Sequence, residues 1–189
     1  MENDKTSIII STPFEVHFDV LLDSGAIMPV KAHANDVGYD MHALSVTYSY
    51  EKQNWFKRML GIEPRITTVK CETGVHLAPK DDSFWVMGVP NSRVSKLPFI
   101  LGNSCGVIDP DYRGSIKFIY NVIPYGKYTN EEVKRFFEPY YDGDEKHQRV
   151  IGQIIPMKRG TMNLTSVNSL STTQRGTGGF GSTEKMKRQ

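Results

Sequence analysis

Apolar and polar residues alternate along several stretches of the chain. Val16, Phe18 and Val20 alternate with charged or histidine positions, and the same pattern recurs over residues 44–50 and 116–122. A strand that buries one face needs this alternation, because successive side chains point to opposite sides of a sheet. Turn-forming runs rich in Pro, Gly and Asp separate the stretches, at residues 78–82, 88–90, 109–111 and 124–126. The pattern predicts an all-β fold of the sandwich, jelly-roll or barrel type.

Two stretches instead indicate short helices between strands. In residues 53–61, apolar side chains recur at helical spacing and Gly61 can end the helix. Those side chains are Trp55, Phe56, Met59 and Leu60. Residues 129–137 begin with Thr129-Asn130-Glu131-Glu132, the arrangement of a capping box. The sequence therefore predicts two short helical insertions in the β fold.

The chain has 189 residues, which suits one domain with a substantial core. From about Asn168 onward it is rich in Ser, Thr and Gly, with few side chains that can pack. We therefore expect a single β domain over residues 1–167 and a flexible, Gly-rich C-terminal arm over residues 168–189.

Charge and cysteine content narrow the class of protein. A net charge of +2 gives no reason to expect a nucleic-acid partner. No apolar run reaches the length of a membrane span, and the first residues lack the pattern of a signal peptide. Cys71 and Cys105 are too few for a disulfide framework, so we expect a reduced, cytoplasmic setting.

Residues 176–181 match the dinucleotide-binding pattern G-x-G-x-x-G. That site also requires a preceding strand, a following helix and an acidic residue about twenty positions later. The sequence continues only to Gln189, so we do not expect a dinucleotide site. Glycine-rich backbone can still approach phosphate groups closely, and Arg175 directly before it supplies a charged fork suited to phosphate.

Five segments occur in an order that has a counterpart in a known family. They are residues 32–41 (AHANDVGYDM, segment one), 90–96 (PNSRVSK, segment two), 102–114 (GNSCGVIDPDYRG, segment three), 149–154 (RVIGQI, segment four) and 175–183 (RGTGGFGST, segment five). Segments three and five are the most specific. Together the five resemble the motifs of the homotrimeric, all-β dUTPases. The resemblance implies a distorted jelly-roll or β-barrel-like fold, and hydrolysis of dUTP to dUMP and pyrophosphate.

Within that resemblance, Asp109 would be the general base that polarises a water for attack on the α-phosphorus. Tyr112 would pack under the deoxyribose and leave no room for a 2′-hydroxyl. Asn103 and nearby backbone would read the uracil edge. The backbone positions expected there are Gly106, Val107 and Ile108.

On the phosphate side, the resemblance implies contributions from the other four segments. Asp40 would orient metal-bound waters or hold the charge pattern of the site, while Ser92 and Gln153 would contact the phosphate chain. Arg175 would clamp the γ-phosphate and Phe180 would stack over the uracil, so the arm would close as a lid over bound dUTP. The other arm residues expected at the nucleotide are Gly179, Gly181 and Ser182.

The resemblance also implies a cofactor and an assembly. Mg²⁺ usually keeps several waters and binds the triphosphate itself, so we expect a nucleotide-borne Mg²⁺ without a fixed set of side-chain ligands. Because the family shares its sites between neighbouring subunits, a homotrimer is implied too. Insertions at residues 49–65 and 124–148 make the chain longer than typical members.

Segment two departs from the family pattern. Asn91 follows Pro90 where the family has arginine. Asn91 could still donate a neutral hydrogen bond to the phosphate chain, but the charge-assisted one, worth roughly 1.5–3 kcal/mol, is lost. Arg93 would point to the same side as Asn91 if the segment were a strand, and could then substitute. In a helix or turn it would point elsewhere.

Two other functions match parts of the sequence. A dCTP deaminase has a similar segment three, but it requires a glutamate ten residues after the aspartate, where this chain has Ile119. A dUTPase-like regulator would use nucleotide-dependent ordering of the arm as a switch for a protein partner. Tight dUTP binding without pyrophosphate release would indicate the regulator.

Overall fold

The computed structural model describes residues 14–123 and 128–178. The chain divides into two units, residues 1–159 and 160–189. In the described part of the second unit, residues 160–178, there is no helix or strand, and nearly every side chain is exposed. The expected division into a β domain and an arm at residues 167 and 168 stays a prediction.

The first four-stranded sheet has the strand order β2-β12-β6-β8, with every pair antiparallel. Its strands are β2 (Tyr39–His42), β12 (Val150–Lys158), β6 (Phe84–Val89) and β8 (Gly106–Ile108). The register of β12 against β2 shifts between Val150 and Gly152, so the ladder is irregular at that point.

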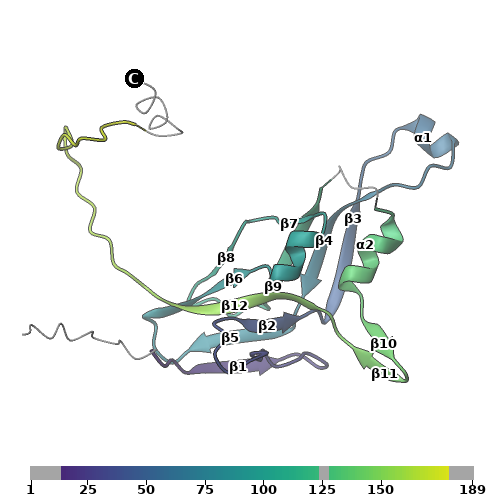
Figure 1. The fold of residues 1–189 in the computed structure, drawn as a ribbon, viewed down its shortest axis with the longest axis horizontal. Helices are drawn as coiled ribbons and strands as arrows, with labels where there is room; N and C mark the ends of the chain where they lie inside the picture. Colours follow the sequence, from purple (N-terminus) through teal and green to yellow (C-terminus); the bar gives the residue numbers. More distant parts are fainter. Residues whose placement is uncertain (1–13, 124–127, 179–189) are drawn as a thin grey trace, which may run out of the picture. The chain divides into compact units, whose positions relative to one another are not determined.

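The second four-stranded sheet has the order β3-β4-β9-β7, also antiparallel. Its strands are β3 (Ser45–Tyr50), β4 (Ile66–Glu72), β9 (Lys117–Val122) and β7 (Phe99–Leu101). Two further antiparallel pairs join β1 (Phe18–Leu22) to β5 (Val75–Pro79) and β10 (Tyr140–Asp142) to β11 (Glu145–His147). The outermost strands of each sheet are not paired with each other, so the described strands form open sheets (Figure 1).

The two four-stranded sheets share one hydrophobic core. Met41 and Val86 from the first sheet belong to the same buried cluster as Val69 and Phe118 from the second. Along β9, buried and exposed side chains alternate, as the period-two pattern over residues 116–122 predicted. The expected all-β class is therefore confirmed, with the core lying between two facing sheets.

Gly152 lets β12 lie directly against Phe118. A Cβ atom at position 152 would lie 2.3 Å from Cε1 of Phe118, whose side chain is buried. Gly152→Ala must displace the ring or the strand, and we expect it to lower the free energy of unfolding by about 1–3 kcal/mol. Gly160→Ala is the matched control, because a Cβ there would meet nothing within 4 Å. Equal denaturant midpoints for the two variants would contradict this packing.

The predicted helix in residues 129–137 is confirmed as α2 (Asn130–Phe137). Its capping box is present in full, with Thr129 and Glu132 bonded reciprocally. The buried Asn130 ties α2 to the second sheet, because its side chain accepts from Ile66 N at 2.9 Å and donates to Pro64 O at 2.9 Å.

The other predicted helix is also confirmed, as α1 (Trp55–Met59) in the connection between β3 and β4 (Figure 1). Asn54 caps it by accepting from Lys57 N at 3.0 Å. None of its residues is buried, and Trp55 is 73% exposed. Helical spacing thus located the helix, although its apolar side chains do not join the core.

Candidate active site

The first sheet brings four of the five segments together. Segment one ends in β2, segment four begins β12, segment two follows β6 directly, and segment three contains β8. Because the strand order is β2-β12-β6-β8, the four segments lie in or directly beside neighbouring strands although they are far apart in sequence. Segment five lies in the second unit.

Asp40 and Gln153 form a hydrogen-bonded pair across β2 and β12. They are register partners, and Gln153 Nε2 donates to Asp40 Oδ1 at 2.9 Å. Gly38 borders this amide, since a Cβ there would lie 2.7 Å from Gln153 Oε1. The glycine of segment one therefore leaves room for the glutamine of segment four, which in turn holds the carboxylate of Asp40 in one orientation.

Asp40, Gln153 and Asp109 project from the same face of the first sheet. Asp40 and Gln153 alternate with the buried Met41 and Ile154, so they point away from the core. In β8, Val107 is 62% exposed, and Asp109 two residues later continues on its side. This outer face is the one on which the predicted site residues can meet a ligand.

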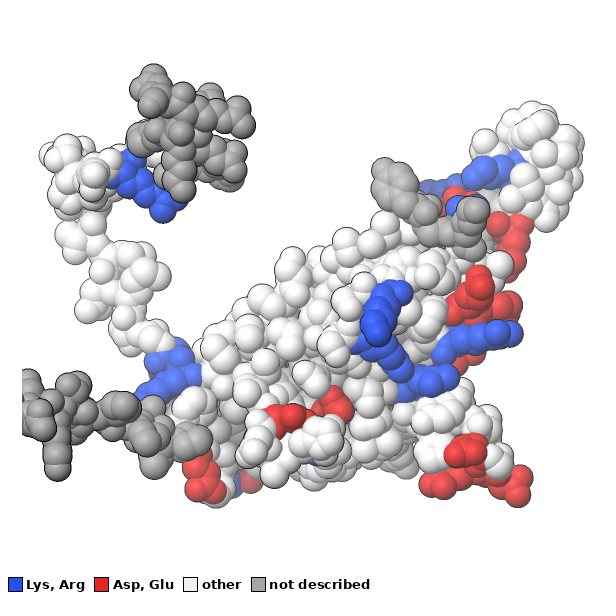
Figure 2. All heavy atoms as spheres, viewed as in Figure 1, with Lys and Arg blue, Asp and Glu red and all other residues white. Residues whose placement is uncertain are grey.

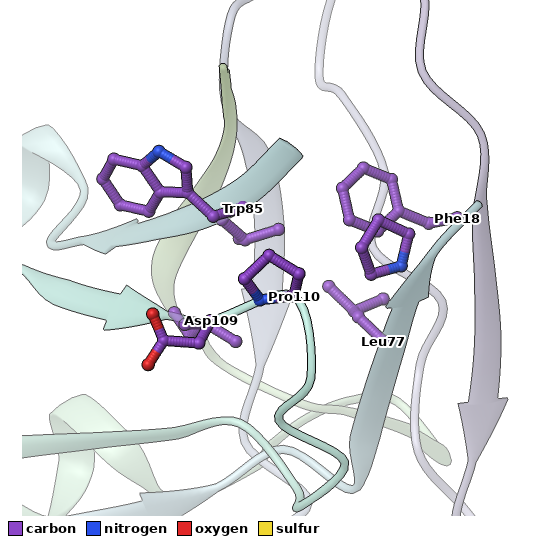
Figure 3. A pocket seen from close by; sticks show the side chains of 8 residues that line it. Phe18, Leu77, Trp85, Asp109 and Pro110 are labelled. Atoms are coloured by element: carbon purple, nitrogen blue, oxygen red, sulfur yellow. The ribbon is translucent and has the colours of Figure 1, made fainter. Parts of the chain in front are cut away.

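Asp109 stands at the end of β8 in a tight, internally bonded turn. Its carbonyl oxygen accepts from Tyr112 N at 3.1 Å, and Arg113 Nη1 donates to Pro110 O at 2.6 Å. The Asp109 side chain borders a crevice whose lining includes Trp85 and Leu77, but the crevice has no room for a water molecule. The carboxylate points away from Pro110 and Leu77 (Figure 3), so its solvent side is the one available to a ligand.

Tyr112 folds back over Gly114. A Cβ at position 114 would lie 2.3 Å from Tyr112 Oη, and this hydroxyl donates to Ser115 O at 3.2 Å. The tyrosine is 43% exposed. Only glycine at position 114 permits this ring position.

Asn103 lies in the turn between β7 and β8. Ser104 there has a φ of 61°, in the left-handed region, and Cys105 N donates to Asn103 O at 2.6 Å. Asn103 Nδ2 is 3.6 Å from where a Cβ of Gly106 would stand. The amide therefore lies over the start of β8, beside the backbone expected to read a base.

Segment two forms a 3₁₀ helix, η1 (Ser92–Lys96), which no sequence pattern predicted. Asn91 precedes it and makes no side-chain capping bond, and Ser92 is exposed. Arg93 donates from Nη2 to Val150 O at 3.0 Å. The strand geometry that would have placed Arg93 beside Asn91 is absent, so Arg93 reaches β12 instead.

One chain does not bring all the predicted residues together. The β8–β6–β12–β2 register aligns Cys105 with Asp40 and Gln153, and Asp109 lies four residues farther along. At roughly 3.3 Å per residue this offset is about 13 Å along the strands, and two strand spacings of roughly 4.8 Å also separate Asp109 from Gln153 across the sheet. Arg175 is exposed in the second unit, where its Nε donates to Gly178 O at 2.9 Å. The remaining arm residues lie outside the described residues: Gly179, Phe180, Gly181 and Ser182.

Trp85 is a neighbour of Asp109 that the sequence did not single out. Extending the β6–β8 register by one residue sets Trp85 opposite Asp109, and both line the same crevice.

Within the described chain, no three His, Cys, Asp or Glu side chains gather in a way that could hold a metal ion. No helix among the described residues has the length and apolar character needed to cross a bilayer.

Known proteins resemble this chain in sequence and fold. A deoxyuridine 5′-triphosphate nucleotidohydrolase of Clostridioides difficile is 31% identical over 164 residues, covering 86% of this chain and 93% of the relative. One from Escherichia phage T5 is 35% identical over 94 residues, and there the match spans only 54% of the relative. The solved dUTPase of Staphylococcus bacteriophage 80alpha with dUPNHPP matches with a TM-score of 0.60 at 21% identity, over 88% of this chain and 97% of that one.

A dUTPase of phage phi11 of S. aureus, described with a structural Mg(II) ion, matches with a TM-score of 0.52 at 19% identity, over 82% of this chain and 99% of that one. No family model matches. The two-sheet fold places the chain in the all-β class, and its relatives in sequence are nucleotidohydrolases. The chain belongs to the deoxyuridine 5′-triphosphate nucleotidohydrolase (dUTPase) family.

Proposed function

We propose that this protein hydrolyses dUTP to dUMP and pyrophosphate, with Asp109 as the general base and Mg²⁺ as the cofactor. The observation that carries the proposal is the first sheet, whose outer face presents Asp109 together with the bonded pair of Asp40 and Gln153. Family membership supports the overall reaction, and this arrangement supports the roles of the residues.

In the proposed reaction, Asp109 accepts a proton from a water molecule while the water oxygen forms a bond to the α-phosphorus. The bond from that phosphorus to the bridging oxygen breaks, and pyrophosphate leaves with the electron pair. The turn of residues 109–112 supports this role. The hydrogen bond from Tyr112 N to Asp109 O fixes the backbone from which the Asp109 side chain projects. Tyr112 would select deoxyribose by filling the space beside the 2′ carbon.

Asp40 is the group that would face the metal. One of its oxygens accepts from Gln153, and no other hydrogen bond of this carboxylate occurs among the described residues, so it can accept from a metal-bound water. A magnesium ion on the triphosphate would neutralise charge on the departing pyrophosphate. Gln153 would keep the carboxylate oriented and also contact the phosphate chain.

Asp109 is offset from the Asp40–Gln153 pair by about 13 Å along the strands and by at least two strand spacings across the sheet, and this separation supports a shared site. A nucleotide that contacts Asp109 and the Asp40–Gln153 pair at close range would then draw them from different copies of the chain. We propose a homotrimer in which neighbouring subunits complete each site, with the arm of residues 168–189 closing over the nucleotide.

A nucleotide panel tests the proposed function. The purified protein is incubated with dUTP, UTP, dTTP and dCTP, and both pyrophosphate and ammonia are measured. We expect pyrophosphate from dUTP and very little from the other three, with turnover abolished by removing Mg²⁺ with a chelator. Ammonia from dCTP would instead indicate a deaminase, and tight dUTP binding without pyrophosphate would indicate a regulator.

A further inference from the structure

The ring of His76, in β5, connects two parts of the chain that are far apart in sequence. Its Nδ1 lies 2.8 Å from the carbonyl oxygen of Arg113, in the turn that follows β8. Its Nε2 lies 3.3 Å from Oδ1 of Asp23, the residue directly after β1. The imidazole therefore stands between the end of β1 and the turn of segment three.

The two oxygens that face the His76 ring are both hydrogen-bond acceptors. A neutral imidazole has one N–H and one lone pair, so it can donate to the carbonyl or to the carboxylate but not to both. Nε2 is buried, so solvent does not reach it to replace the carboxylate. Only the doubly protonated ring matches both the Arg113 carbonyl and the Asp23 carboxylate.

The surroundings of the ring favour this protonated form. The hydrogen bond to Arg113 O raises the pKa of His76, partial burial opposes this rise, and the Asp23 carboxylate adds to it. Because folding raises this pKa, the contacts of the imidazolium are fully present below the ordinary histidine pKa of about 6.5. They are lost as the pH rises through the higher pKa of the folded protein.

The other charged groups around His76 already have partners or lie elsewhere. On β1, Asp19 is paired with Lys80 at 2.5 Å. In the turn, the Arg113 guanidinium donates to two carbonyl oxygens of the turn itself, at 2.6 Å and 3.1 Å. Acidic side chains gather over the β10–β11 hairpin (Figure 2), but the carboxylate that raises the His76 pKa is that of Asp23.

The edge of β5 holds the chain that leads back to Asp109. Ile116 N donates to Val75 O at 2.9 Å, and the contact of His76 with Arg113 O continues this attachment toward the turn. Arg113 Nη1 in turn donates at 2.6 Å to the carbonyl oxygen of the residue directly after Asp109. A change at the His76 ring is therefore transmitted to the backbone from which the Asp109 side chain projects.

We propose that protonated His76, paired with Asp23, is a positioning residue that holds the turn carrying Asp109 and Tyr112 in place for dUTP hydrolysis. This inference rests on the proposed function, and neither His76 nor Asp23 belongs to any of the five segments. The ring acts through the Arg113 carbonyl. When it loses its proton, one of its two contacts fails, the turn loosens and the general base is held less firmly.

NMR tests the connection between the ring and the turn, with the full chain in its assembled form. The ring signals of His76 and the amide signals of residues 112–114 are followed across pH. We expect His76 to titrate above the ordinary histidine value, and the turn amides to shift with the same midpoint. Asp23→Asn should lower that midpoint. His17→Gln is the matched control, because His17 is exposed and its carboxylate neighbour Glu15 lies 3.9 Å away.

The kinetic test measures kcat and KM for dUTP over the same pH series. In wild type and in His17→Gln, kcat should fall about twofold to tenfold as the pH rises through the pKa of His76, with a smaller change in KM. His76→Gln should lack this step, because the amide has the same donors at every pH. Asp23→Asn should move the step to lower pH.

A His76 ring that titrates without any shift of the turn amides would overturn the proposal. So would a pH step in kcat that both His76→Gln and Asp23→Asn leave unchanged. If His76→Gln does not fold, Asp23→Asn alone decides. A wild type in which ring and turn titrate together, yet which releases no pyrophosphate from dUTP, would refute the proposed function and leave the coupling of His76 to the turn standing.

Discussion

Asp109→Asn is expected to lower kcat for dUTP by about 10²–10⁴-fold while dUTP binding stays nearly unchanged. The amide has the size of the carboxylate but cannot accept a proton from the attacking water. Its backbone carbonyl still accepts from Tyr112 N, so the turn should keep its conformation. Single-turnover measurements of pyrophosphate release, together with dUTP binding by calorimetry, separate chemistry from affinity.

Asp111→Asn is the matched control, because it makes the same chemical change two residues away at an exposed position. We expect this variant to turn over dUTP at nearly the wild-type rate. A kcat for Asp109→Asn within a few-fold of the control would remove Asp109 from the role of general base.

Removal of residues 175–189 is expected to leave a folded assembly whose kcat for dUTP falls by at least about 10³-fold. An arginine on a transferring phosphate is worth that much in related chemistry, and the deletion also removes the lid that would exclude water. Folding should survive, because every residue of the buried core cluster lies in the first unit, and residues 160–177 are exposed. Circular dichroism, sedimentation and pyrophosphate release are the measurements.

A shorter deletion, of residues 184–189, keeps segment five and serves as the control. We expect it to retain nearly full activity. Aggregation or unfolding of the longer deletion would show that the arm is a structural element, and undiminished turnover would show that it is not a lid.

Local sequence patterns predicted the elements that short-range interactions stabilise. The capping box at Thr129 and Glu132 located α2, since its hydrogen bonds join residues three positions apart. Alternation over residues 116–122 located β9 and also showed which side chains it buries. At α1, helical spacing located the helix but did not show that Trp55 would be exposed, because exposure depends on what packs nearby.

The sequence did not predict η1, and the role expected for Arg93 depended on it. Residues 92–96 carry no capping box or apolar periodicity, and 3₁₀ turns of this length have weak sequence signals. Once the segment is helical, Arg93 extends toward β12 and donates to Val150 O. The position of the Arg93 side chain therefore depends on a backbone conformation that residue types alone did not show.

The sequence by itself determined the all-β class, both α-helices and the identity of the residues in the five segments. Only the tertiary structure decided that Asp40 bonds to Gln153, 113 positions away, and that Trp85 stands opposite Asp109. The strand register brings these residues opposite each other, and the register follows from the collective packing of two sheets around one core. Helices and strands depend largely on contacts between residues that are close in sequence. The site depends on pairing between strands that are far apart in sequence, and no local sequence pattern shows that pairing.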